Sequence, residues 1–128
     1  MARYESGGAR DMVSARRKTR IPERGDIMWV SLDPTRGHEQ AGRRPVIVLS
    51  ESEFNRTCGM MLIIPITSKH KGYSNEVPIV TEKISGAALT SQLRAIDWKS
   101  RRAELIDTCP PEMLHDIQDI CTTYISGE

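Results

Sequence analysis

The sequence has no long apolar run and few cysteines. No stretch approaches the roughly 20 apolar residues that a membrane helix needs, and residues 1–20 lack the hydrophobic middle segment of a secretory signal. Cys58, Cys109 and Cys121 have no metal-binding or redox spacing, and their odd number fits a reducing cytoplasm. We therefore expect a cytoplasmic protein that does not enter a membrane, in which each cysteine is a small packing residue.

Motifs for metal-dependent hydrolysis are also missing. The sequence has no DxD, no HExxH and no paired Cys/His spacing, and its three histidines, His38, His70 and His115, are scattered. Most nucleases gather carboxylates around divalent ions, and such a cluster is hard to find here. We expect neither a metal nor another cofactor.

Length and charge predict one domain with a basic extension. A chain of 128 residues is long enough for one core, and we expect a domain over residues 21–128 after a mobile basic tail over residues 1–20. Residues 1–24 hold seven Lys/Arg against three acids, whereas residues 25–128 hold eleven bases against fourteen acids. A domain of this charge can hold a nucleic acid only through a local basic patch.

Short apolar runs rich in β-branched residues predict a mainly β fold. The predicted strands cover residues 27–30, 47–49, 60–66, 77–80, 87–90 and 92–97, the last two possibly forming one bent strand. Pro65 predicts an edge or a bulge in the third of these. So many short strands in series indicate a small, strongly bent antiparallel barrel. Apolar residues spaced three and four apart from Met113 to Ile125 predict a C-terminal amphipathic helix, entered through Pro110 and Pro111.

Two polar residues stand at ends of predicted strands. Arg44 lies where a loop of about a dozen residues enters the strand RRPVIVL, and Thr67 lies at the exit of LIIPI. Without a metal, RNA can still be cut, because its 2′-hydroxyl supplies the nucleophile; such a site needs donors for the phosphoryl oxygens. If the two strands are neighbours, a guanidinium and a hydroxyl converge on one phosphate. Taken singly, an arginine or a threonine in a loop indicates no such role.

Other polar residues admit two interpretations. Lys69, His70 and Lys71 either line an RNA path or form a solvated turn. Tyr73 and Trp98 either stack on bases or, for Trp98 above all, belong to the core.

Three segments together resemble a known family. The segments GDIMWVSLDPTRGHEQAGRRPVIVLS, GMMLIIPITSKHKGYSNEV and ALTSQLRAIDW look like the MazF/PemK family of toxin ribonucleases, in the family's order and spacing from about residue 23 to residue 125. The resemblance implies an SH3-like small barrel with a C-terminal helix and a homodimer. It also implies cleavage of single-stranded RNA at a short sequence, and a cognate antitoxin whose acidic segment covers the RNA groove.

The resemblance also assigns site residues. It implies Arg44, Thr67 and Glu39 as the catalytic set, with Gln40, Arg43, Ser68, Lys69 and Gln92 near the substrate groove. To these RNA-binding candidates we add His38, His70, Lys71 and Tyr73; several relatives have a small polar residue in place of His38, which bears on base preference. Two alternatives remain open at this point: a gyrase-binding toxin of the CcdB kind on the same barrel, and an RNA-binding barrel without catalysis.

Overall fold

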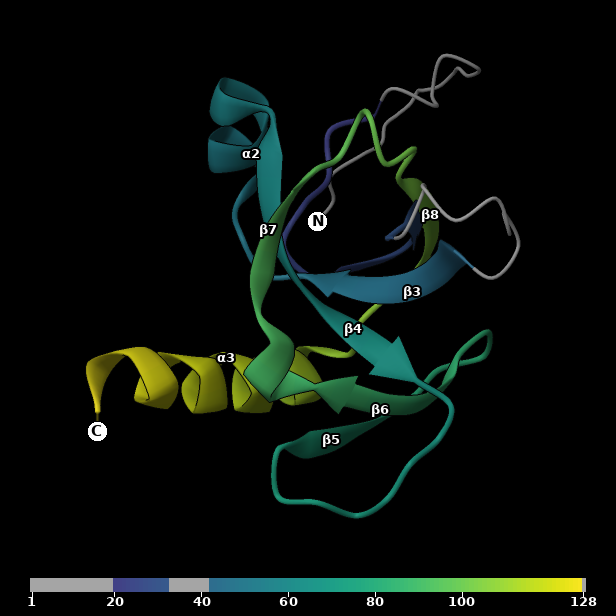
Figure 1. The fold of residues 1–128 in the computed structure, drawn as a ribbon, viewed down its shortest axis with the longest axis vertical. Coiled ribbons are helices and arrows are strands. Elements are labelled where there is room, and N and C mark those ends of the chain that lie inside the picture. The colour runs from purple at the N-terminus through teal and green to yellow at the C-terminus, as the bar shows by residue number, and fades with distance from the viewer. Residues whose placement is uncertain (1–19, 33–41, 128) are drawn as a thin grey trace.

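The described part of the chain consists of a curled antiparallel sheet and its helices (Figure 1). The computed structural model describes residues 20–32 and 42–127, so residues 1–19, 33–41 and 128 lie outside the description. The strands are β2 (Asp26–Ser31), β3 (Arg43–Val48), β4 (Met60–Thr67), β5 (Glu76–Val80), β6 (Ser85–Leu89), β7 (Arg94–Asp97) and β8 (Glu104–Thr108). The helices are α2 (Ser52–Cys58), the 3-10 turn η2 (Thr90–Gln92) and α3 (Pro111–Ser126). None of these helices is both long and apolar enough to cross a membrane.

Strand β4 is the centre of the sheet. The strand order is β5-β6-β4-β3-β2-β8, and β7 also pairs with β4. One edge of β4 pairs with β3, while its other edge pairs with β7 at Met60–Ile63 and with β6 at Ile66 and Thr67. The change of partner bends the sheet into a half-barrel, which confirms the predicted fold class (Figure 1).

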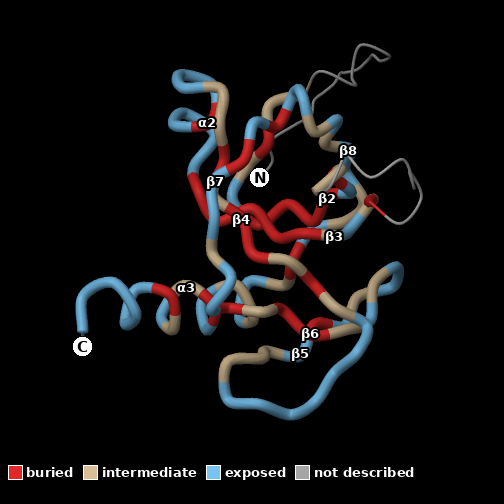
Figure 2. The backbone as a smooth tube through the Cα atoms, in the orientation of Figure 1, coloured by how far each residue is buried: buried red, intermediate tan, exposed pale blue. Residues whose placement is uncertain are grey.

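Two apolar cores lie on the two faces of the sheet. The buried residues gather along the central strands β2, β3 and β4 (Figure 2). Side chains alternate between faces along a strand, so neighbours in sequence enter different cores. Ile27 belongs to the first core and Met28 to the second. The first core also contains Ile117 and Cys121 of α3, whereas the second closes around Met61 and the ring of Trp98.

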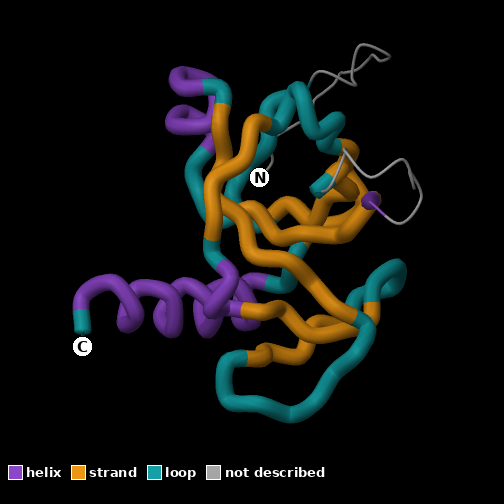
Figure 3. Tube along the Cα trace, in the orientation of Figure 1, coloured by secondary structure: helices purple, strands orange, loops and turns teal. Residues whose placement is uncertain are grey.

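Helix α3 closes the first core beside η2 and β5 (Figure 3). Proline at its first position is compatible with a helix start, because that N–H would have no partner within the helix. Ile117 and Cys121 are the buried residues of α3, as the apolar spacing predicted. The Tyr124 hydroxyl also shares a 2.8 Å hydrogen bond with Thr90 Oγ1, which joins α3 to η2.

The structure corrects two expectations. The strand with Pro65 is an interior strand, not an edge; Pro65 stands between the residues of β4 that pair with β7 and those that pair with β6, where its missing N–H interrupts neither ladder. Cys58 is exposed and does not pack in a core, although Cys109 and Cys121 do. The two strands predicted over residues 87–97 are confirmed as separate strands, β6 and β7, with η2 between them. Helix α2 and strand β8 were not predicted at all.

Asn55 attaches α2 to the sheet. Its side chain is fully buried, and its Nδ2 donates to the carbonyl oxygens of Pro22 at 2.8 Å and Ser50 at 3.2 Å. Its Oδ1 accepts a hydrogen bond from the Ser50 hydroxyl, and its backbone oxygen accepts the indole N–H of Trp98 at 2.9 Å. The helix is therefore held by polar contacts where a short element of seven residues offers little apolar burial.

We predict that Asn55→Leu lowers the free energy of unfolding by about 3 kcal/mol, because it leaves several buried polar groups without partners. Urea denaturation followed by circular dichroism measures the loss. Glu53→Ala on the same helix removes only an exposed ion pair with Arg56 and should change stability by less than about 0.5 kcal/mol. Equal effects of the two substitutions would refute the structural role of Asn55.

Candidate functional site

A cleft of about 820 Å³ opens where β2, β3 and β4 approach the β5–β6 hairpin and β7. The described residues that line it are Trp29, Leu32, Arg43, Arg44, Pro45, Pro65, Ile66, Thr67, Ser68, Lys69, Lys83, Ile84, Ser85, Leu89, Gln92 and Arg94. Six of the sequence-predicted site residues meet here: Arg43, Arg44, Thr67, Ser68, Lys69 and Gln92.

The cleft is positively charged. Its described lining contains five Lys/Arg side chains and no Asp or Glu. Residues 25–128 as a whole hold more acids than bases, so the positive charge is gathered locally. This distribution confirms the expected local basic patch and favours a polyanionic ligand.

Arg44 and Thr67 meet through the pairing of β3 with β4. These strands are antiparallel neighbours, with Val46 opposite Pro65. The pairing of β3 with β4 ends at this pair; Arg44 and Thr67 each lie two residues beyond it on their strands, and both line the cleft. The condition stated for these two residues, neighbouring strands and a shared cleft, is therefore met.

The Arg44 guanidinium keeps most of its donors for a ligand. Arg44 is exposed, and its Nη1 donates to the backbone oxygen of Arg43 at 3.1 Å. Among the described residues, no carboxylate pairs with it. A guanidinium carries five N–H donors in a planar fork, which suits two oxygens of one phosphate.

Arg43 differs from Arg44 in this respect. Its guanidinium donates to Ser31 Oγ and to the Arg102 carbonyl oxygen, each at 3.1 Å, and forms a 3.1 Å ion pair with Glu104. These contacts attach the start of β3 to β2 and β8. Arg43 lines the cleft, but most of its hydrogen-bonding capacity is used within the protein.

The Thr67 hydroxyl is oriented by the loop that follows it. Thr67 Oγ1 accepts the backbone N–H of Lys69 at 3.0 Å. Because the oxygen accepts this bond, the hydroxyl hydrogen remains available to donate to a ligand. The backbone of Thr67 is fixed by pairing with Ala87 in β6.

Gly86 allows β6 to approach this threonine closely. A Cβ atom at Gly86 would collide with the carbonyl oxygen of Thr67. The β4 backbone at the site therefore depends on the absence of a side chain at residue 86.

Glu76 organises the loop over residues 68–75. Its Oε1 accepts the backbone N–H groups of Lys71 at 2.9 Å and Gly72 at 2.8 Å, and lies 3.1 Å from Nδ1 of His70. Partial burial of Glu76 disfavours its charge, but the two N–H donors and the nearby His70 outweigh that cost and lower the pKa of Glu76 below its usual value of 4.5. The loop is thus wound around one carboxylate.

The structure divides the predicted RNA-binding residues into two groups. Ser68, Lys69 and Gln92 line the cleft together with Arg43. His70, Lys71 and Tyr73 belong to the same loop as Ser68 but are not part of the cleft lining, and the Tyr73 side chain is exposed. His38, Glu39 and Gln40 lie outside the described residues.

Among the cleft residues with an aromatic or charged side chain, three escaped the sequence analysis: Trp29, Lys83 and Arg94. Trp29 was included in an apolar strand, and the two cations belong to segments without a motif. A weak signal existed for Arg94, since it lies two residues after Gln92 within a segment that resembles the family. In residues 20–32 and 42–127, no group of three or more His, Cys, Asp or Glu side chains could hold a metal ion.

Comparison with known proteins gives a consistent result. Residues 23–122 match the family model described as PemK-like, MazF-like toxin of type II toxin-antitoxin system. The endoribonuclease toxin MazF of Escherichia coli K12 is 43% identical over 98 residues, covering 77% of this chain and 88% of that protein. The endoribonuclease PemK of Escherichia coli is 33% identical over 116 residues, covering 87% of this chain and 86% of that protein.

Solved structures agree with the sequence matches. A MazE-MazF crystal structure from Deinococcus radiodurans superposes with a TM-score of 0.78 at 35% identity, covering 85% of this chain and 99% of the matched chain. Fold, cleft and sequence all lead to one assignment: the chain belongs to the PemK-like, MazF-like family of type II toxin-antitoxin toxins.

Proposed function

We propose that the chain is an endoribonuclease that cuts single-stranded RNA in this cleft and thereby inhibits translation and growth. The observation that carries the proposal is that Arg44 of β3 and Thr67 of β4 line one cleft, whose described lining holds five cations and no acid. The names of the relatives at 43% and 33% identity, both endoribonucleases, support it.

The chemistry that fits these groups uses the substrate as its own nucleophile. The 2′-oxygen attacks the adjacent phosphorus, a 2′-oxygen to phosphorus bond forms, and the bond from phosphorus to the 5′-oxygen breaks. The products are a 2′,3′-cyclic phosphate and a 5′-hydroxyl. In this scheme Arg44 stabilises the charge that gathers on the phosphoryl oxygens, and Thr67 donates its hydroxyl hydrogen to a non-bridging oxygen.

Proton transfer involves residues beyond the two central ones. A guanidinium rarely gives up a proton, so we assign Arg44 mainly an electrostatic role, with delivery of a proton to the leaving 5′-oxygen as a secondary one. Glu39, which lies outside the described residues, either accepts the 2′-hydroxyl proton or orients Arg43 or Arg44.

We also propose the partners that accompany this activity: a cognate antitoxin and a second copy of the chain. The cations of the cleft would attract an acidic, flexible antitoxin segment as they attract RNA. The related MazE-MazF complex of Deinococcus radiodurans supports this inference. Action on mRNA implies a cytoplasmic location.

We predict that the purified protein cleaves a long RNA in the presence of excess EDTA. The new ends should carry a 2′,3′-cyclic phosphate and a 5′-hydroxyl, because the nucleophile comes from the substrate. Sequencing the ends reports activity, metal dependence and the recognition sequence in one experiment. Cleavage that stops on chelation and returns with Mg²⁺ would contradict the mechanism.

We predict that Arg44→Ala and Thr67→Ala each slow cleavage by about 10²-fold or more, since each removes a donor to the transition state. Thr67→Ser should retain most activity because it keeps the hydroxyl. Arg56→Ala and Thr123→Ala serve as matched controls on α2 and α3, away from the cleft lining, and should cleave normally. Full activity of both site variants would remove the assignment of the reaction centre.

We predict that Glu76→Gln slows cleavage severalfold and loosens the loop over residues 68–75. A folded-state pKa below the usual value means that the charged carboxylate stabilises the loop above pH 4.5 and that this contribution is lost as pH falls below it. The protection factors of the Lys71 and Gly72 amides, which correct for the intrinsic slowing of exchange in acid, should therefore fall below pH 4.5 in the wild type but not in Glu76→Gln. Glu112→Gln on α3 is the control, and identical exchange profiles for wild type and Glu76→Gln would disprove the role.

A further inference from the structure

The lining of the cleft combines an apolar row of strand residues, here called its floor, with cationic side chains, here called its rim. Ile27 of β2 pairs with Ile47 of β3, which pairs with Ile64 of β4, and all three are buried in the first core. Two residues further along, Trp29 pairs with Pro45, and Ile66 follows on β4. Side chains two residues apart on a strand share a face, so this second row continues the core face into the cleft.

Trp29 is the part of this floor that solvent can reach. It is 38% exposed and is the single exposed residue of β2. It is also the one aromatic side chain among the described residues that line the cleft. Its neighbour Val30 pairs with Arg44, so the indole lies on the strand beside the reaction centre.

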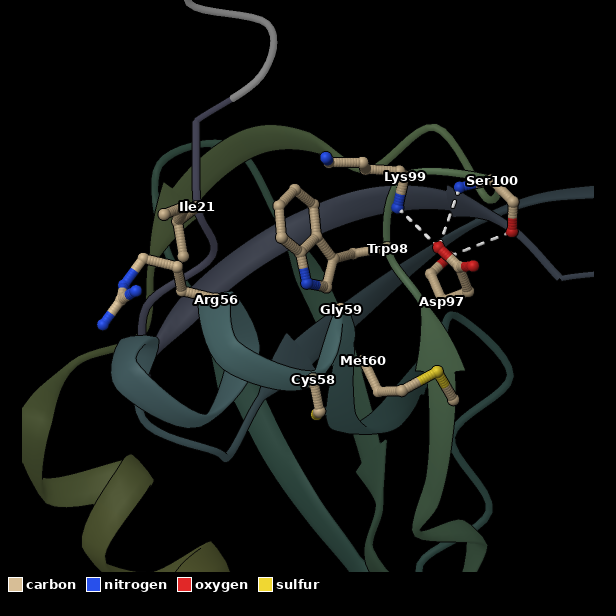
Figure 4. Close-up of a pocket in the computed structure, with 9 residues that line it drawn as sticks. All are labelled: Ile21, Arg56, Cys58, Gly59, Met60, Asp97, Trp98, Lys99 and Ser100. Atoms are coloured by element: carbon tan, nitrogen blue, oxygen red, sulfur yellow. Dashed lines mark hydrogen bonds between the residues drawn. The ribbon is translucent and has the colours of Figure 1, made fainter.

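The other tryptophan occupies a different environment. Trp98 is 6% exposed, and its Nε1 is committed to the backbone oxygen of Asn55. The hollow above it combines charges of both signs, Arg56 and Lys99 with Asp97, and the Asp97 carboxylate caps the backbone of Lys99 and Ser100 (Figure 4). Trp98 is thus a core residue, which was the favoured of its two interpretations from the sequence. The hollow lacks the uniform positive charge that a polyanion requires.

We propose that Trp29 is a base-stacking platform, on which a nucleobase beside the scissile phosphate lies on the apolar floor while the phosphates follow the cationic rim. This inference rests on the proposed function. An indole face stacks on any nucleobase, and such stacking strengthens binding without selecting one base strictly. Arg44, Lys69 and Arg94 lie along the same cleft. In this proposal they contact the phosphates of the RNA.

Two probes separate stacking from charge. The first is a single-stranded 2′-O-methyl RNA oligonucleotide of mixed sequence, which lacks the nucleophile and is not cut. The second is an abasic deoxyribose-phosphate chain of equal length, which has the same phosphates and no bases. Trp29→Ala should bind the first about tenfold more weakly and the second as well as the wild type does. Trp29→Phe should recover part of the loss.

Phe54→Ala is the matched control, because Phe54 is also an exposed aromatic residue, on α2 and outside the cleft lining. It should bind both probes normally. Thermal melting of each variant checks the fold, so that a general loss of structure is recognised by a weaker affinity for both probes.

Fluorescence gives a second readout that does not depend on the alanine variant. The chain has two tryptophans, so wild type minus Trp29→Phe isolates the emission of Trp29. The mixed-sequence oligonucleotide should quench this emission, whereas the abasic chain should leave it nearly unchanged. Trp98 alone, in Trp29→Phe, should respond to neither.

The proposal is overturned if Trp29→Ala binds both probes like the wild type, if it loses equally on both, or if the abasic chain quenches Trp29 as strongly as the oligonucleotide does. These outcomes are distinguishable from failure of the proposed function. If Trp29→Ala cleaves RNA normally while Arg44→Ala does not, the nuclease assignment stands without the platform.

Discussion

The pairing of β3 with β4 is the constraint on which the site depends. Antiparallel strands bring the start of one beside the end of the other, so Arg44 and Thr67 come to line one cleft although 22 residues of chain separate them. The interior of both strands is buried, and a slip by one residue would move Val46 and Ile64 each into the core on the opposite face. The energy of apolar packing thus positions two polar groups that contribute little to stability themselves.

The placement of the charged residues matters more for this protein than its net charge. Residues 25–128 are acidic overall, and Glu112, Asp116 and Asp119 lie on α3, away from the cleft lining. The cations of the cleft come from separate segments: β3, the loop after β4, the β5–β6 turn and β7. A polyanion that approaches this protein is attracted by the cleft and repelled by helix α3. The two effects orient the polyanion before it makes contact.

The sequence predicted those elements in which buried apolar residues recur at a regular spacing. The strands at 26–31 and 60–67 and helix α3 follow from apolar runs and spacing, and Arg44 and Thr67 follow from their places at strand ends together with the family resemblance. Helix α2 escaped because it buries only Asn55, which leaves no apolar period to detect. Strand β8 has no buried residue. Lys83 and Arg94 escaped because only the curl of the sheet brings their segments to the cleft; no local pattern encodes that meeting.

The closeness of β6 to β4 has a consequence for how this site tolerates change. Gly86 carries no functional group and touches no substrate in the scheme proposed above, yet any heavier residue there must displace the peptide that presents Thr67. Activity can therefore be lost by adding a single methyl group behind the reaction centre, with every polar participant still present. Few substitutions should therefore be tolerated at residue 86, although glycine itself has no side chain that could take part in the reaction.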